Sequence, residues 1–434
     1  MPGTLQPPSA GTDESERRWR VALGALVAVR LAIPLLTLAF SGHTLPGLPA
    51  YRYQPLNGDS FGFYSATREF ISSLGRVNRP LLLLASVLVV VATVIGVRLW
   101  RRSPARRVLA VLLPAAALSL AVTLPIHQMH PPGAAVFGWP LLWSIPMIPI
   151  RAVGLEPTPD VAFVIGLLLT LGALSVTVVG TAYVGLYATG RRSIGLIAAG
   201  LFTLGPLVSR PLAGASAWEN GQWNVDVGLH LYTEPLSTAL VVLSVALVLR
   251  PATQQLGRAG AGLAIGYAAV VKLTNGVVGV VLAVLVARRH GLRQAMPYAA
   301  GGLVSLPIVL AYWPKGYVGM FDGATSASAR PWSLSYADDA WAHSLLYTPR
   351  LLLVVAPLLL LGCFAIRDRW LLAVVCTPIV VNAVIYSFYD VTALHPRFLY
   401  VALPFVFVLE ASGAIAVADA VRRRLRSTSE VRVL

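Results

Sequence analysis

Val161–Tyr187 is a run of 27 residues without a charged side chain. A helix of that length extends about 40 Å, which exceeds the roughly 30 Å hydrocarbon core of a bilayer. Only 12% of the 434 residues are charged, and the mean hydropathy is +0.72. Because about a quarter of the residues in a soluble domain are charged, the composition predicts a multi-pass membrane protein built from helices.

Other apolar runs are long enough to cross, or nearly cross, the same core. A further pair, Ala261–Val271 and Val277–Val286, is short and is interrupted by "KLTNG". We interpret this pair as a hairpin of two short spans, which predicts an all-α bundle of about twelve transmembrane helices. The remaining runs are Val21–Phe40, Leu81–Val97, Val108–Ile126, Ile194–Val208, Leu236–Leu249, Met296–Tyr312, Leu351–Ile366, Leu371–Phe388 and Phe398–Val417.

The charges follow this topology when the N-terminus lies inside. The inner segments then hold 22 of the 34 basic residues and 6 of the 18 acids, which accounts for the whole net charge of +16. Short loops rich in basic residues mark the cytoplasmic side of a membrane protein, so nucleic acid is not needed as a partner. We expect a plasma-membrane protein with a disordered cytoplasmic tail at 1–20, a transmembrane domain at 21–421 and a basic cytoplasmic tail at 422–434.

Polar chemistry is concentrated in the outer segments, because the inner loops are short and mostly arginine. The sequence therefore predicts an active site on the extracytoplasmic face. Its walls come from five segments, of which 127–160 is rich in proline and is expected to be a juxtamembrane or re-entrant helix. These segments are 41–80, 127–160, 211–235, 313–350 and 389–397.

The first outer segment contains "NGDSFGFYSATREF", from Asn57 to Phe70. Asp59 lies in a turn-rich context and could cap the helix that follows it. Tyr64 falls on a short interfacial helix, where it would either pack in an aromatic belt or stack on a sugar. Arg68 follows one turn later and would either hold a phosphate or extend toward the interface.

Two later outer segments supply further candidates. His130 in "MHPPG" is expected to contact a donor phosphate or sugar, whereas a metal site with His127 rests on two lone histidines. In "LYTEP" Thr233 or Glu234 is expected to cap the helix that begins near Pro235. Glu234 is therefore either that cap or a second carboxylate that binds substrate. Trp223 would stack on a sugar or anchor the interface.

Two basic residues are candidates for binding a phosphate group. Arg397 in "HPRF" has a planar fork that suits a pair of phosphate oxygens. Lys272, at the tip of the predicted hairpin, is costly in lipid, although a lysine there could also extend to the interface. Arg30 and Glu410 fall at comparable depth in the first and last spans, which predicts a buried ion pair.

Four motifs together resemble the GT-C superfamily of membrane glycosyltransferases. They are "NGDSFGFY", "MHPPG", "LYTEPLSTALV" and "HPRFLYVALPFVFVL", all on the predicted outer side. The resemblance implies a GT-C-like transmembrane domain and an activated sugar carried on a polyprenyl phosphate. It also implies that Asp59 is the catalytic acid of the first outer loop, where a carboxylate can take the acceptor's proton during transfer with inversion.

The hypothesis that follows is an inverting glycosyltransferase, most simply an actinobacterial mannosyltransferase, with an outer-leaflet glycolipid, lipoglycan or cell-wall polysaccharide as acceptor. No cofactor is required, and a divalent metal is disfavoured because the first loop has no adjacent second carboxylate. An arabinofuranosyltransferase of the same fold is the first alternative. A transporter or flippase of lipid-linked sugars is the second, although the unequal loops and the lack of an internal repeat argue against it.

Overall fold

The computed structural model is a bundle of helices, and no strand occurs in the part of the chain that it describes. That part comprises residues 13–40, 56, 59–101, 103–130, 137–213, 229, 231, 233–251, 254–323, 349–388 and 396–431. The helices are α1 (Asp13–Ala39), α2 (Asp59–Leu74), α3 (Arg79–Trp100), α4 (Pro104–Gln128), α5 (Gly138–Ala152), α6 (Pro159–Thr189), α7 (Arg192–Ala213), α10 (Glu234–Leu249), α11 (Gln255–Val271), α12 (Thr274–His290), α13 (Leu292–Leu303), α14 (Leu306–Gly323), α16 (Pro349–Ala365), α17 (Arg369–Ser387), the 3-10 helix η3 (Pro396–Ala402) and α18 (Leu403–Val431).

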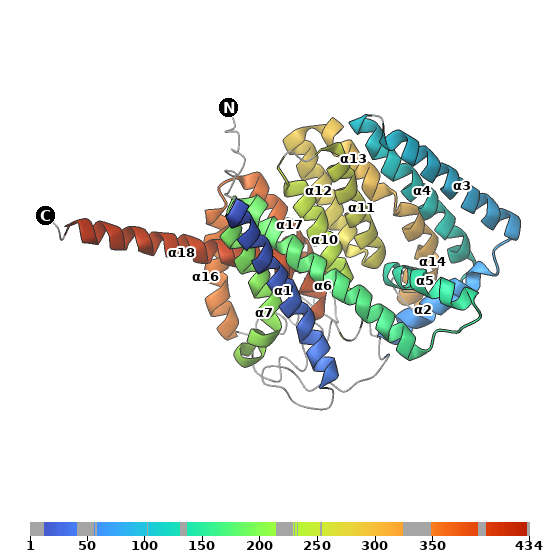
Figure 1. The fold of residues 1–434 in the computed structure, drawn as a ribbon, viewed down its shortest axis with the longest axis horizontal. Coiled ribbons are helices and arrows are strands. Elements are labelled where there is room, and N and C mark those ends of the chain that lie inside the picture. The colour runs from blue at the N-terminus through green and yellow to red at the C-terminus, as the bar shows by residue number, and fades with distance from the viewer. Residues whose placement is uncertain are drawn as a thin grey trace.

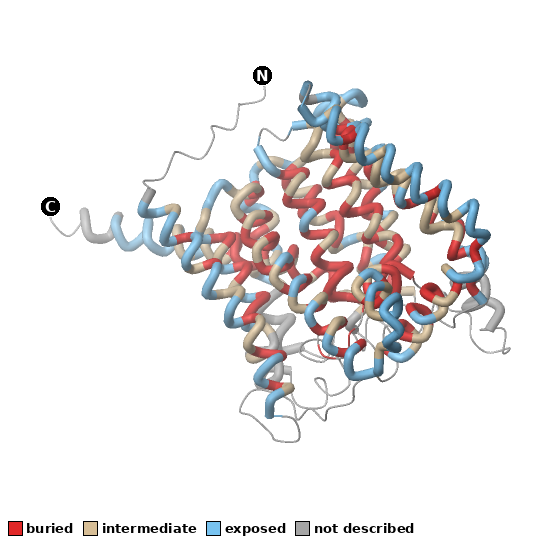
Figure 2. Tube along the Cα trace, turned by 45° about the vertical axis from the view of Figure 1, so that its right-hand side comes forward, coloured by how far each residue is buried: buried red, intermediate tan, exposed pale blue. Residues whose placement is uncertain are grey.

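Seven helices of the described residues are long and apolar enough to cross a membrane, which supports a multi-pass membrane protein. α3 illustrates their surroundings: only 11% of its most apolar window is buried, and its exposed residues are largely leucine and valine. A surface of this kind suits lipid rather than water. Figure 2 shows α3 as largely exposed, whereas buried residues gather in the central helices. The total of twelve spans stays a prediction.

The sequence explains where several of these helices begin and end. The Thr158 hydroxyl accepts a hydrogen bond from the Val161 amide at 3.3 Å, which caps α6 ahead of Pro159. Gly190 ends the same helix in the left-handed conformation at φ +72°, which glycine adopts without steric cost. At α17 the Asp368 carboxylate accepts from the Trp370 amide at 2.8 Å. These caps occur where long apolar runs meet short polar connections.

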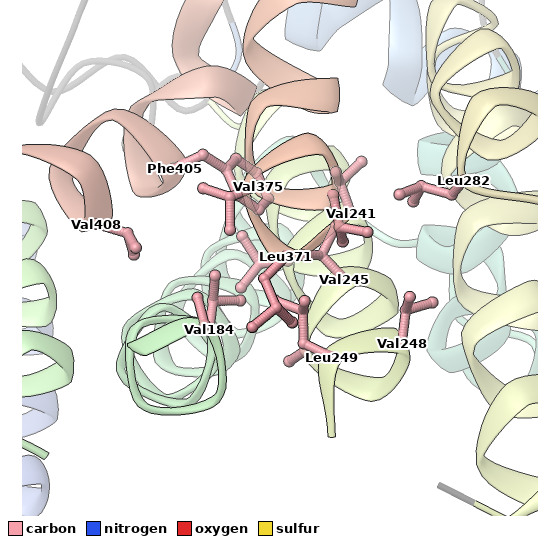
Figure 3. Packing of buried hydrophobic residues seen from close by; sticks show 14 of the residues in the cluster. Val184, Val241, Val245, Val248, Leu249, Leu282, Leu371, Val375, Phe405 and Val408 are labelled. Atoms are coloured by element: carbon pink, nitrogen blue, oxygen red, sulfur yellow. The ribbon is translucent and has the colours of Figure 1, made fainter. Parts of the chain in front are cut away.

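The centre of the bundle is formed by α10 with α6, α11 and α17 around it (Figure 1). Thirteen of the sixteen residues of α10 are buried, as expected of a helix that is apolar on all sides. Valines dominate its core contacts, and Figure 3 shows Val241 and Val245 beside Leu371 of α17 and Val184 of α6. α10 therefore holds its first residue, Glu234, in a fixed position at one end of the bundle.

α11 and α12 form the hairpin that the sequence predicts. Each is 17 residues long, and they are joined through Lys272 and Leu273. Each extends about 26 Å, slightly less than the bilayer core, so a full crossing by each stays a prediction. The predicted single span at Met296–Tyr312 is interrupted, since α13 ends at Leu303 and α14 begins at Leu306.

Basic residues gather at the end of the bundle where α6 meets α7 and α12 meets α13, which we call the basic end. Ion pairs tie the helices together here, as between Arg192 and Glu16 at 2.7 Å and between Arg191 and Asp419 at 2.6 Å. α18 extends outward past the other helices (Figure 1). α12 runs from Thr274 to His290 at the basic end, so the α11–α12 turn lies at the opposite end of the bundle. The start of α10 lies there too, because Glu234 contacts Lys272 in that turn.

Candidate functional site

The candidate site is a buried ion pair between α10 and the α11–α12 turn. Lys272 Nζ lies 3.0 Å from Glu234 Oε1. Lys272 is 6% exposed and Glu234 is 2% exposed. The sequence predicts functional roles for both residues, and the structure brings them into direct contact.

Two aromatic rings complete the surroundings of the lysine. Its Nζ lies 5.1 Å from the ring centre of Tyr386, in the last turn of α17, and 4.6 Å from that of Phe398 in η3. The two rings are stacked, with centres 5.2 Å apart and planes 20° from parallel. A cation over a ring face is attracted by the ring's quadrupole, by about 2 kcal/mol when water is excluded. Three elements, α10, α17 and η3, therefore converge on the ammonium group of the α11–α12 turn.

Glu234 does not serve as the cap of α10. The N-cap residue is Thr233, and no side-chain capping hydrogen bond is made by it in the described structure. Pro235 occupies the first turn as expected, and the Thr233 hydroxyl lies 3.4 Å from Glu234 Oε2. The capping interpretation of Glu234 is thus wrong, and its carboxylate instead neutralises Lys272.

A layer of neutral polar groups lies next to the pair. Asn275 Nδ2 donates to Ser237 Oγ at 2.7 Å and to the Ala268 carbonyl at 3.1 Å. The Thr274 and Tyr386 hydroxyls are 2.9 Å apart. These bonds tie the start of α12 to α10, α11 and α17, and so fix the turn that carries Lys272.

α5 packs on the backbone immediately before Lys272. A Cβ added to Gly138 would lie 2.5 Å from the Val271 amide nitrogen, so only glycine permits this approach. The Tyr267 hydroxyl donates to the Gly138 carbonyl at 2.7 Å. At 15 residues α5 extends about 22 Å, and its placement as a juxtamembrane or re-entrant helix stays a prediction.

The chain leading into α10 also has an unusual backbone. Leu231 has φ +56° and is fully buried. The left-handed conformation costs a residue with a side chain roughly 1–2 kcal/mol. Such strain persists where surrounding packing enforces it, and it is typical of functional sites. Leu231 belongs to a buried cluster that also contains Leu236 and Val271, next to the two charged residues of the pair.

Tyr64 and Arg68 of α2 connect to the same cluster but contact other groups. Tyr64 is buried in the cluster, and its hydroxyl donates to the Pro157 carbonyl at 2.7 Å. Arg68 forms an exposed ion pair with Glu156 at 3.3 Å. His130 is exposed, and its backbone amide donates to Glu69 at 2.8 Å. These contacts hold α2 against α4 and against the segment between α5 and α6.

Three other predicted site residues are only partly placed. Asp59 is the first residue of α2, and Arg397 lies in η3 next to Phe398, but their side chains are outside the described residues. Trp223 lies outside them altogether. Among the described residues, no group of three or more His, Cys, Asp or Glu side chains could hold a metal ion.

The predicted ion pair between Arg30 and Glu410 is wrong. Both side chains are buried, but Arg30 Nη2 donates to the Tyr400 hydroxyl at 3.2 Å and the guanidinium lies over the Phe202 ring at 5.5 Å. No ion pair joins the two within the described structure. Similar depth along two helices was insufficient, because η3 supplies Tyr400 to Arg30 instead.

Sequence reasoning did not single out Tyr386 or Asn275. The signal for both was weak: a tyrosine near the end of an apolar run and an asparagine inside "KLTNG".

Fold and site together define a multi-pass helical membrane protein with a buried, aromatic-lined lysine–glutamate pair. No family model matches the chain, and no curated protein is significantly similar to it in sequence.

Proposed function

We propose that this protein is a membrane glycosyltransferase that moves a sugar, mannose in the simplest case, from a polyprenyl phosphate to an acceptor at the outer leaflet or cell wall. The observation that carries the proposal is the buried Lys272–Glu234 pair with its 3.0 Å contact. An ionised pair excluded from water is expensive, and charged residues inside membrane proteins commonly mark substrate sites.

The position of the pair supports a substrate carried on a lipid. It lies at the end of the bundle opposite the basic end, among the starts of α10 and α12, the last turn of α17 and η3. Arg397 belongs to η3, next to Phe398, which contacts Lys272. With the positive-inside rule the basic end is cytoplasmic, so the pair would face the extracytoplasmic side, where sugars arrive on lipids.

In the proposed reaction Asp59, at the start of α2, takes the proton of the acceptor hydroxyl as the new bond forms on the sugar. The departing group is the polyprenyl phosphate, whose charge Lys272 and Arg397 stabilise. The sugar carbon inverts its configuration, because the acceptor attacks on the face opposite the phosphate. Tyr64, Arg68, His130 and Trp223 stay predictions as substrate contacts.

Asp59→Asn tests the catalytic assignment. It removes the base but keeps the size of the side chain, so transfer should fall by at least a hundredfold, the scale of general base catalysis. The melting temperature of the purified protein should stay within about 2 °C of wild type. Wild-type transfer by the variant would exclude Asp59 as the base. Asp419→Asn is the matched control, since it makes the same exchange at an exposed ion pair with Arg191 at the basic end.

A lipid-sugar flippase is the second candidate, because a buried ion pair beside a hairpin of two short helices also suits alternating access. Purified protein in vesicles, given polyprenyl phosphates that carry labelled mannose or arabinofuranose, separates the functions. A labelled acceptor identifies a transferase and its donor sugar. Movement of intact donor between leaflets identifies a flippase. If the protein neither labels an acceptor nor moves the donor between leaflets, both functions are refuted.

A further inference from the structure

We propose that Glu234 is a displaceable counter-ion. It neutralises Lys272 when no substrate is bound, and it gives way to the phosphate group of a lipid-linked substrate, which then binds the lysine ammonium in its place. The identity of this anion rests on the proposed function, whereas the exchange rests on the surroundings of the two side chains.

The first argument is the bonding of the ammonium group. A lysine ammonium has three N–H donors. Within the described part of the chain, Glu234 Oε1 is the one oxygen within hydrogen-bond distance of Nζ, and the other neighbours are the rings of Tyr386 and Phe398. Ring faces stabilise a positive charge but do not fix which anion accompanies it. As far as the described residues go, the other two donors of the ammonium have no oxygen partner and can bind a group with several oxygens, such as a phosphate.

The second argument is that the released carboxylate stays stabilised. Glu234 is the first residue of α10, where the aligned peptide dipoles favour a negative charge. The Thr233 hydroxyl already lies 3.4 Å from Oε2. Glu234 can therefore lose its lysine partner without becoming an unsupported buried charge. A carboxylate in the middle of a span would lack both forms of support.

The third argument concerns charge balance and mobility. Replacing one anion by another keeps the buried lysine neutralised, whereas adding a phosphate beside an unmoved carboxylate would place two negative charges together. Both residues lie at helix ends, Lys272 between α11 and α12 and Glu234 at the start of α10. Side-chain rotation there leaves the interior hydrogen bonds of the helices intact.

Binding of a polyprenyl phosphate without sugar to the purified full-length protein tests the exchange. Glu234→Gln removes the competing charge and should bind this lipid at least tenfold more tightly than wild type. Lys272→Gln, alone or combined with Glu234→Gln, should bind at least tenfold more weakly. Asp419→Asn is the control, because it removes a carboxylate paired with an arginine at the basic end. Its affinity should equal that of wild type.

Unchanged or weaker binding by Glu234→Gln would overturn the exchange and indicate that Glu234 binds or orients substrate itself. Should that variant not fold, Glu234→Asp decides, since a shorter carboxylate holds Lys272 less well and should also bind more tightly. A polyprenol without phosphate should not respond to either variant. Inorganic phosphate that binds as tightly as the lipid would overturn the lipid-linked substrate.

The same variants separate this inference from the proposed function. If wild type transfers no sugar but Glu234→Gln binds the lipid phosphate more tightly, the transferase proposal fails and the exchange stands. If wild type transfers sugar but Glu234→Gln binds no more tightly, the exchange fails and the transferase proposal stands.

Discussion

The charges of Lys272 and Glu234 should stabilise the folded protein only together. Removing either one alone should therefore lower the free energy of unfolding by several kilocalories per mole. At the observed 3.0 Å, Coulomb attraction with an effective dielectric constant near 20 is about 5 kcal/mol. Removing one partner of a buried pair typically costs about 3–5 kcal/mol, because the other charge is left buried. We therefore expect Glu234→Gln and Lys272→Met each to lower the free energy of unfolding by about 3–5 kcal/mol.

The double variant should lose less than the sum of the two single losses, because it leaves no isolated charge. We expect a coupling energy of about 2–4 kcal/mol from the double-mutant cycle, measured from SDS-induced unfolding in mixed micelles. The matched control is Arg191→Gln with Asp419→Asn, whose side chains are 53% and 34% exposed. An exposed pair should couple by less than about 1 kcal/mol. Equal coupling in the two cycles would refute the reasoning.

Two further predictions concern packing around the site. Tyr400→Phe should lower the free energy of unfolding by about 1–3 kcal/mol, because it removes the hydrogen-bond acceptor of the buried Arg30 guanidinium. Tyr298→Phe is its control and should be nearly neutral, since that buried hydroxyl has no hydrogen-bond partner in the described structure; equal losses would contradict the argument. Gly138→Ala should cost about 1–3 kcal/mol through overpacking against Val271, measured in the same titration, and a stability equal to wild type would show that α5 can shift away.

The sequence was informative wherever one physical quantity dominated. Long apolar runs predicted transmembrane helices, because segments of this length without charged side chains are more stable in the bilayer than in water. The interruption "KLTNG" correctly predicted the α11–α12 hairpin with Lys272 at its turn. The prolines after His130 predicted a short helix, and α5 has 15 residues; its position relative to the membrane stays a prediction. Glu234 and Lys272 were each singled out because a charge beside an apolar run is costly unless something compensates it.

The sequence did not show which buried polar side chains contact one another. Only the tertiary structure decided those contacts. Comparable depth in the predicted membrane spans suggested that Arg30 pairs with Glu410, yet Arg30 contacts Tyr400. Nothing in the local sequence joined Lys272 to Glu234, 38 residues earlier, or to the rings of Tyr386 and Phe398. Composition and periodicity determine which residues are removed from water, because the free energy of that transfer depends mainly on the side chain itself. Which charge meets which depends on how helices pack around one another, and that is a property of the whole bundle.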